Sequence, residues 1–269
     1  MAIELSRSGG TLDLCHVFER ERLVAEVGGL PDGARLLDEL TVRAGEDLEE
    51  WRSRAAASVP AVESHSLGGW RAWDSITTFA KNLGHDLIVV GAGSRRHGLL
   101  GSTAERVVRH APCSVLVVVG EPRPLKRLLC AVDFSEPARE AVAAAAALAG
   151  QHAAALTLAH ALSVAELAGM TWAPAALDKA QRDVADSLAD WARTAEKSAG
   201  RAVTTRVLDG APGEAILAAA RATDQDLIVT GTHGRTGIRR AVLGSLAEHL
   251  VRHSDRRVLV VRAAPRRSS

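Results

Sequence analysis

Short apolar runs alternate with longer amphipathic segments along the chain, most clearly in its second half. Several of these runs are rich in β-branched residues, and segments with apolar residues at helical spacing lie between the runs. Strands that are apolar throughout and separated by helices are typical of a parallel sheet covered on both faces. The pattern predicts strands at Leu128–Val132, Ala155–Ala161, Ala202–Leu208, Leu227–Thr230 and Arg257–Val261, and helices at Pro137–Gly150, Leu177–Ala199, Gly213–Thr223 and Gly244–Arg252.

This series occurs twice. The run DLIVVG at 86–91 returns as DLIVTG at 226–231, and LEEW at 48–51 returns as LADW at 188–191. Other pieces follow in the same order, which indicates an internal duplication. The seam is the proline-containing run EPRP at 121–124, which stops the preceding strand. We therefore predict a first domain over residues 1–120 and a second over residues 125–264. Trp51 and Trp191, which end the repeated runs LEEW and LADW, are expected to pack in the hydrophobic cores of the two domains.

Charge and cysteine content exclude several classes of protein. The net charge of +1 gives no sign of a nucleic-acid binder. Three cysteines without a CxxC pair indicate free thiols in a reducing compartment, and no cluster of cysteines and histidines has the spacing of metal ligands, so we predict no metal site. No apolar run is long enough to span a bilayer, and no signal pattern opens the chain, so we expect a soluble cytoplasmic protein without a membrane partner.

A glycine-rich loop follows the fourth strand of the second copy. It reads GTHGRTG at 231–237, and Gly244-Ser245 then opens a helix. Glycines let backbone N–H groups approach an anion, and a helix N-terminus adds unpaired donors and partial positive charge. The loop is thus a candidate phosphate site, with a plain glycine-rich turn as the alternative.

The second copy resembles the universal stress protein family. Gly231, Gly234, Gly244 and Ser245 fit its pattern Gly-x2-Gly-x9-Gly-Ser, LLCAVDFS at 128–135 is similar to its first strand and acidic turn, and Gly210-Ala211-Pro212 resembles its Gly-x-Pro segment. The resemblance covers residues 125–262. It implies tandem Rossmann-like α/β domains of the adenine-nucleotide α-hydrolase type, with helices on both faces of parallel sheets. It further implies the strand order 3-2-1-4-5 in the second domain and ATP lying across the strand ends.

The resemblance also assigns ligand contacts. Val132, Asp133 and the backbone near Ala161 would meet the adenine. The ribose and phosphates would be held by Gly231, His233, Gly234, Arg235, Gly244 and Ser245. From the residues alone, Asp133 could instead cap the following helix, and His233 is better explained as a loop or turn residue than as a catalytic group, so no catalytic residue is assigned. We expect bulky residues at Gly231 and Gly244 to abolish binding while leaving the fold intact.

The first copy is incomplete by the same comparison. Its strand LCHVF begins at residue 14 and LAHAL at residue 158, an offset of 144 that aligns Met1 with Ala145. The first copy therefore lacks a counterpart of the first strand, which is central in the family, and of Asp133. Either a hole in its sheet or contact between its second and fourth strands should result. Ser94 also stands where Gly234 does, so this degenerate copy is not expected to bind ATP. A start codon assigned too far downstream and genuine loss of the segment both remain explanations.

Three functions compete. The first is an ATP-binding regulatory or sensing protein of the stress response, with ADP or AMP as alternative ligands and Mg²⁺ as the accompanying ion. The second is a non-binding scaffold, in which the fifth strands, Ser114–Val119 and Arg257–Val261, pair within the chain or the chain forms a homodimer. The third is a slow ATP hydrolase, which the lack of a Gly-Lys-Ser/Thr motif and of an acidic pair disfavours.

Overall fold

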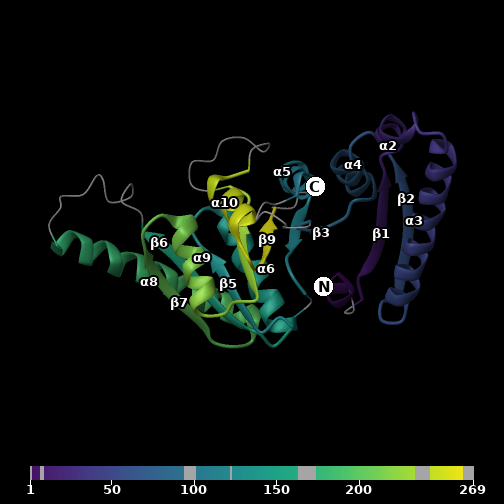
Figure 1. Cartoon of the computed structure of the whole chain (residues 1–269). Helices are drawn as coiled ribbons and strands as arrows, with labels where there is room; N and C mark the ends of the chain where they lie inside the picture. Colours follow the sequence, from purple (N-terminus) through teal and green to yellow (C-terminus); the bar gives the residue numbers. More distant parts are fainter. Residues whose placement is uncertain are drawn as a thin grey trace. The chain divides into compact units, whose positions relative to one another are not determined.

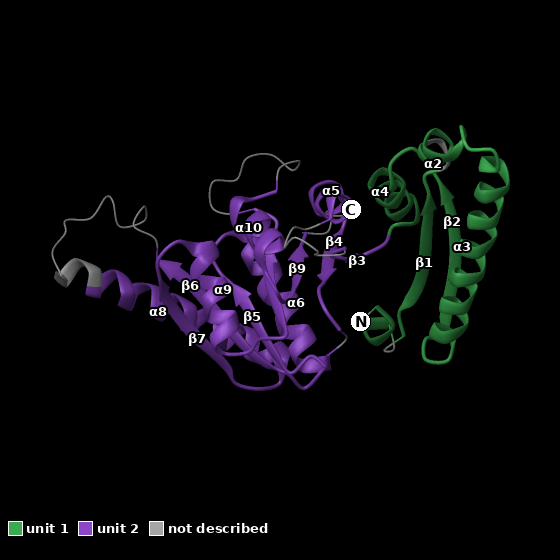
Figure 2. Ribbon diagram, in the orientation of Figure 1, with its two compact units in different colours: residues 1–84 green, residues 85–269 purple. Residues whose placement is uncertain are grey.

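The computed structural model describes residues 2–6, 9–93, 101–121, 123–162, 174–233 and 243–262. These form two compact units, Met1–Gly84 and His85–Ser269 (Figure 2). The division between the units lies well before the proline-containing seam at 121–124, because two strands of the first copy belong to the second unit. The domain limits 1–120 and 125–264 describe the sequence repeat and stay a prediction.

Unit 1 is built on two parallel strands, β1 and β2, which pair over their full length. Helix α3 packs on both strands, and α4 packs on β1. The glycine that ends α4, Gly84, adopts a left-handed backbone with φ of 70°, which glycine tolerates without strain. The elements of this unit are α1 (Ala2–Ser6), β1 (Thr11–Phe18), α2 (Arg20–Val27), α3 (Gly33–Ala56), β2 (Ala61–Gly68) and α4 (Ala72–Leu83).

Unit 2 is a seven-stranded sheet in the order β3-β4-β9-β8-β5-β6-β7 (Figure 1). All its neighbouring strands run parallel except the pair β4 and β9. Helices α6 and α8 pack on one face of the sheet, and α9 and α10 on the other. The elements are β3 (Leu87–Gly91), α5 (Ser102–His110), β4 (Ser114–Val118), β5 (Arg127–Ala131), α6 (Glu136–Gln151), β6 (Ala155–Leu162), α8 (Pro174–Ala199), β7 (Val203–Asp209), α9 (Pro212–Ala222), β8 (Leu227–Gly231), α10 (Ser245–His253) and β9 (Arg257–Val261).

The α/β class and the helix-covered parallel strands agree with the expectation from the sequence. Every residue of β8 and β9 is buried, as expected for apolar runs covered on both faces. Read from β7 to β9, the second copy places its third, second, first, fourth and fifth strands side by side, the order that the family resemblance implies.

The strands of the first copy are divided between two sheets. β1 and β2 form a two-stranded sheet, whereas β3 and β4 belong to the seven-stranded sheet. The first copy therefore does not keep its strands in one sheet. The physical reason is the missing central strand: in the second copy β5 joins β6 to β8, and the first copy has nothing to join β1 to β3 in this way. The second and fourth strands of the first copy, β1 and β3, are not paired with each other, so the sheet of this copy is interrupted.

Large apolar side chains are exposed in unit 1. In the second copy, Trp191 on α8 meets the ring of Phe134 edge-on at 5.5 Å. Its counterpart on α3, Trp51, is 54% exposed and contacts only the guanidinium of Arg54 among the described aromatic and cation–π contacts. The expectation that both tryptophans pack in a core is wrong for Trp51, because the first copy has no residue in the place of Phe134. In the described part of the chain, the exposed large apolar side chains all lie in unit 1: Val24, Leu30, Leu36, Leu40, Val42, Trp51, Trp70 and Leu83.

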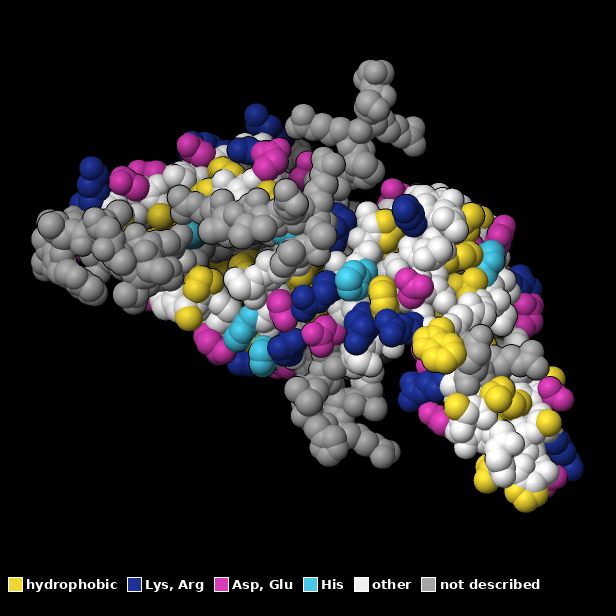
Figure 3. Space-filling model, turned by 90° about the horizontal axis from the view of Figure 1, so that it is seen from above, with side chains coloured by type: hydrophobic (Ala, Val, Ile, Leu, Met, Phe, Trp, Pro, Cys, Tyr) yellow, Lys and Arg dark blue, Asp and Glu magenta, His cyan; other side chains and the backbone are white. Residues whose placement is uncertain are grey.

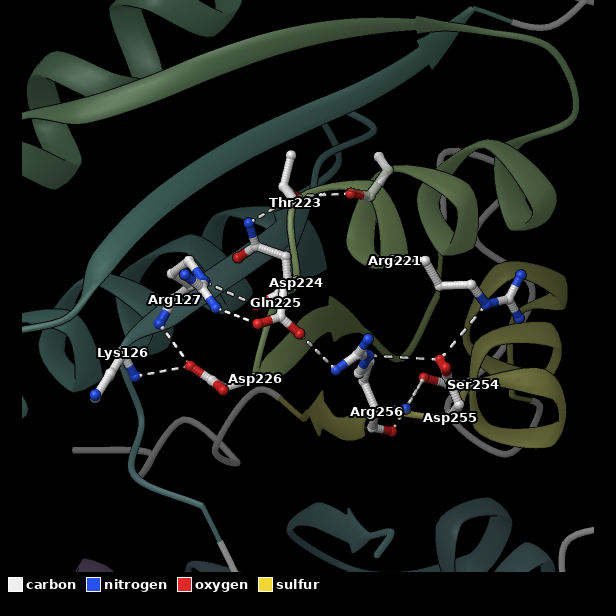
Figure 4. Close-up of polar contacts among 11 residues, drawn as sticks. Lys126, Arg127, Arg221, Thr223, Asp224, Gln225, Asp226, Ser254, Asp255 and Arg256 are labelled. Atoms are coloured by element: carbon white, nitrogen blue, oxygen red, sulfur yellow. Dashed lines mark hydrogen bonds and ion pairs between the residues drawn. The ribbon is translucent and has the colours of Figure 1, made fainter.

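A polar network fastens the amino ends of the central strands of unit 2 (Figure 4). The carboxylate of Asp226, just before β8, accepts hydrogen bonds from the backbone N–H groups of Lys126 and Arg127, both at 2.9 Å. The Arg127 and Arg256 side chains both bind the Asp224 carboxylate, the latter at 3.0 Å. This network ties the start of β5, directly after the seam, to the start of β8, at the end of the sheet away from the candidate site.

Two further features concern the helices and the charged side chains. Among the described residues, none of the helices combines the length and apolar character that crossing a bilayer requires. On the face seen in Figure 3, basic and acidic side chains are interspersed rather than gathered by sign.

Candidate functional site

A cavity of about 370 Å³ opens at the carboxyl ends of the central strands of unit 2. This volume lies in the range of small-molecule sites, roughly 300–1,000 Å³. Ligands of open parallel sheets bind at this edge. The cavity is lined by the last residues of β5, β6 and β8, by the residues that directly follow β5 and β8, and by the first turns of α6, α9 and α10: Ala131, Val132, Asp133, Ala138, Ala159, His160, Ala161, Ala211, Pro212, Gly213, Glu214, Ile216, Thr230, Gly231, Thr232, His233, Gly244, Ser245, Leu246, Ala247 and His249.

The acidic turn after β5 forms one wall. The Asp133 carboxylate accepts hydrogen bonds from the backbone N–H of Ser135 at 3.0 Å and from its hydroxyl at 2.5 Å. Ser135 is the N-cap of α6, and its hydroxyl oxygen accepts from the backbone N–H of Ala138 at 3.2 Å. Ser135 therefore caps the helix, and Asp133 supports the cap from outside. The carboxylate lies at the cavity with its position fixed by this turn.

Phe134, between Asp133 and the cap, holds an unusual backbone conformation. Its φ of 62° is left-handed, which costs a bulky residue free energy. The ring packs between two others, His160 at 5.0 Å and Trp191 at 5.5 Å between centroids. We infer that these ring contacts offset the strain and fix the direction in which the acidic turn leaves the strand.

His160 is a site residue that the sequence interpretation missed. It is 3% exposed, lines the cavity, and its Nδ1 lies 2.7 Å from the carbonyl oxygen of Val132. A ring nitrogen that donates to this carbonyl holds the backbone at the place where β5 gives way to the acidic turn. Its sequence signal was present: a histidine stands inside the apolar strand LAHAL at 158–162, where only a partnered polar group is stable.

The first turn of α10 forms the opposite wall. The backbone N–H of Gly244 donates to the carbonyl of Thr232 at 2.7 Å, and Thr232 in turn donates to Val261 at 3.2 Å. These bonds place the helix N-terminus beside the end of β8. Because the first N–H groups of a helix have no partner within it, this wall offers donors and partial positive charge to an anion.

His233 adds a polar group between the two walls. Its Nδ1 lies 2.9 Å from the Thr232 hydroxyl. Its Nε2 is buried and has no hydrogen-bond partner among the described residues. A buried imidazole nitrogen of this kind is ready to bind a ligand oxygen or hydroxyl.

Of the sequence-predicted site residues, Val132, Asp133, Ala161, Gly231, His233, Gly244 and Ser245 all line this one cavity. Gly234 and Arg235 lie outside the described residues. Gly210, whose φ is 112°, lies in the turn after β7, and Pro212 lines the cavity. The assignment of these residues to nucleotide contacts stays a prediction.

Gly231 has a second role that the sequence did not indicate. A Cβ atom there would lie 2.8 Å from both the carbonyl carbon and the carbonyl oxygen of Pro137 in α6. Glycine is therefore required for the close approach of α6 to the end of β8. The expectation that a bulky residue at Gly231 leaves the fold intact is corrected, because backbone atoms rather than a flexible side chain fill the space.

The first copy keeps only the second wall of the site. Gly101 donates to the carbonyl of Ala92 at 2.9 Å, and Ala92 donates to Val118 at 2.9 Å, which repeats the hydrogen bonds of Gly244 and Thr232. Helix α5 begins at Ser102 as α10 begins at Ser245. The sequence of the first copy has no counterpart of β5 or of its acidic turn, so the opposite wall has no equivalent.

Comparison with known proteins matches one family across both copies. The model of the universal stress protein family matches residues 1–119 and 124–262. Universal stress protein Rv2623 of Mycobacterium tuberculosis is 29% identical over 244 residues, which cover 87% of this chain and 75% of the relative.

Solved structures show the same fold at low identity. A universal stress protein from Archaeoglobus fulgidus aligns with a TM-score of 0.63 at 19% identity, over 97% of this chain and 89% of its own. A similar protein from Pseudomonas aeruginosa, described as a putative universal stress protein, aligns with a TM-score of 0.60 at 19% identity, over 98% and 96%.

Proposed function

Because the chain belongs to the universal stress protein family, we propose that its second copy binds ATP or a related adenine nucleotide. Occupancy of this site serves a regulatory or sensing role in a cytoplasmic stress response. One observation carries the proposal: a single cavity brings together the acidic turn after β5 and the N-terminus of α10, which are far apart in the sequence.

The two walls suit the two ends of a nucleotide. The acidic turn supplies the acceptor oxygens of Asp133, which can bind an exocyclic amine or a ribose hydroxyl, and Ala161 of β6 adds apolar surface to the cavity. The α10 wall offers backbone donors to phosphates. Gly234 and Arg235 belong to the segment between β8 and α10 and are proposed to complete the phosphate contacts, with Mg²⁺ accompanying a triphosphate.

Isothermal titration of the full chain with ATP in the presence of magnesium tests this function. We expect saturation near one nucleotide per chain, because only the second copy has both walls. AMP and ADP titrated in parallel report how much the phosphates contribute. Absence of heat, together with absence of a shift in the unfolding temperature, would contradict nucleotide binding and favour a scaffold.

A scaffold role is the second candidate, and a specific observation favours it. β4 and β9 pair antiparallel, with Val115 opposite Val260 and Val117 opposite Val258. We propose that this contact between the two fifth strands joins the copies within one chain, with domains that follow the repeat at 1–120 and 125–264. Pairing hides two strand edges that would otherwise recruit other chains. A homodimer that uses the same edges is the competing arrangement.

A further inference from the structure

We propose that unit 1 holds a divalent transition-metal ion, of the Zn²⁺ class, between Asp13, Glu63 and His65. One ligand atom from each side chain lies within 4.8 Å of the others. The His65 Nε2 stands between the two carboxylates, 2.8 Å from Asp13 Oδ1 and 3.6 Å from Glu63 Oε2. This cluster is separate from the candidate nucleotide site, which lies in unit 2.

The sheet register brings the three residues together. Asp13 on β1 stands directly opposite Glu63 on β2, and His65 lies two residues further along β2. Since alternate residues of a strand point to one face, the three side chains emerge on the same side of the sheet. The His65 ring also contacts the ring of Phe79 on α4, with centroids 4.8 Å apart, which fixes its orientation.

Electrostatics favours a cation at this position. Two carboxylates directly opposite each other on neighbouring strands repel. The Asp13 side chain is only 18% exposed and that of His65 25%, so water screens this wall of the cluster incompletely. A neutral imidazole nitrogen can donate one hydrogen bond, which satisfies one of the two carboxylates. A divalent ion neutralises both.

The distances and the donor types fit a metal of the Zn²⁺ class. Zn²⁺ bonds to imidazole nitrogen and carboxylate oxygen are about 2.0–2.2 Å, which places neighbouring ligand atoms about 3.4 Å apart in tetrahedral geometry. The two distances from His65 Nε2, 2.8 and 3.6 Å, bracket this value. Imidazole favours Zn²⁺, Ni²⁺ or Cu²⁺ over Mg²⁺. Three protein ligands leave the fourth position for water.

Zn²⁺ binding to the full chain tests the proposal. Protein stripped of metal is titrated at neutral pH with Zn²⁺ against a chromophoric chelator, with excess Mg²⁺ present. We expect one site per chain that Mg²⁺ does not compete for, and affinity at least about tenfold lower in Asp13→Asn, Glu63→Gln and His65→Gln. Because the Glu63 side chain is 77% exposed, Glu63→Gln removes a ligand charge without disturbing packing.

Controls separate this site from other histidines. His16→Gln changes a histidine on β1 that points to the opposite face, and should leave Zn²⁺ affinity unchanged. His249→Gln disrupts the pair that His249 forms with His253 on α10, where the rings lie 4.4 Å apart. The proposal is overturned if the wild type binds Zn²⁺ no more tightly than Glu63→Gln, or if affinity is lost in His249→Gln and kept in the three site variants.

Discussion

Leu116 and Leu259 stand opposite each other in the antiparallel ladder between β4 and β9, and both are buried. They occupy the same place in the two copies of the repeat. Glu105 and Glu248 are also equivalent, as are Arg109 and Arg252, and the ion pairs cross between copies: Arg109 to Glu248 at 3.3 Å and Arg252 to Glu105 at 2.7 Å. The contact thus has local two-fold character, so each copy offers the other the same surface.

A disulfide across this ladder distinguishes pairing within the chain from pairing between chains. Opposed residues of antiparallel strands have Cα atoms about 4.5–5.5 Å apart, which suits a disulfide. We expect oxidised Leu116→Cys/Leu259→Cys protein, prepared with the native cysteines replaced, to run as a monomer on a non-reducing gel. Each single variant serves as control. A reducible dimer band from the double variant would instead support the homodimer.

The start of α10 offers a selective test of the phosphate wall. Ser245 is exposed at the first helical position, so a glutamate there suits the positive end of the helix and should preserve stability. Placed beside phosphates, the same charge repels them. We expect Ser245→Glu to lower ATP affinity at least about tenfold, because the added charge would repel the phosphates at short range.

Its matched control is Ser102→Glu, at the equivalent start of α5 in the first copy. We expect this variant to bind ATP as the wild type does. Titration calorimetry of both proteins, with adenosine as a second ligand, gives the comparison. Equal loss in the two variants would refute a single site in the second copy, and no loss in Ser245→Glu would remove α10 from the site.

Local sequence patterns predict most of the strands and helices of the second copy and part of the candidate site. Apolar runs placed the strands of the second copy within a few residues, and Gly244 with Ser245 marked a helix start. Contacts between distant segments could not be read in this way. The packing of Gly231 on Pro137 and the convergence of Asp13 with His65 depend on how strands and helices meet, which spacing along the chain does not report.

The repeated aspartate before the fourth strand should differ in importance between the copies. Asp226 accepts two backbone hydrogen bonds at the start of β5, whereas the first copy has no such strand for Asp86 to bind. We expect Asp226→Ala to lower the free energy of unfolding by about 1–3 kcal/mol, as is usual when donors lose a charged partner. Asp86→Ala should change it by less than about 0.5 kcal/mol. Urea denaturation measures both, and equal effects would contradict the clamp.

The three thiols should react in a fixed order as pH rises. Burial, and then the charge of Asp86, raise the pKa of the Cys113 thiol to about 11. Since the thiolate is the nucleophile, about one Cys113 in a thousand is reactive at pH 8, and the rate should rise about tenfold per pH unit. Burial also raises the pKa of the fully buried Cys130, which should react only after unfolding.

Cys15 is exposed and should be modified first. Although part of the residue is accessible, neighbouring atoms exclude water from much of its surroundings; this desolvation, and then the charge of Asp13, raise the pKa of the Cys15 thiol, so it should react more slowly than a free cysteine. Iodoacetamide labelling followed by peptide mass spectrometry, from pH 7 to pH 10, gives the rates. Modification of Cys130 in folded protein at a rate near that of Cys15 would show that the central strand is not buried as described.

Replacing Gly231 should destabilise the folded protein even when no ligand is present. An added Cβ would meet the backbone of Pro137 at 2.8 Å, and moving α6 away from β8 loosens the core on that face. We expect Gly231→Ala to lower the free energy of unfolding by about 1–3 kcal/mol, the usual cost of overpacking. Gly91, its counterpart at the end of β3, has its nearest described neighbour at 4.0 Å, so Gly91→Ala should be neutral or slightly stabilising.

Urea denaturation of the two variants without nucleotide separates packing from binding, because neither measurement involves a ligand. If Gly231→Ala proved as stable as the wild type, α6 would have room to move, and loss of ATP affinity in that variant could then be assigned to the phosphate loop itself.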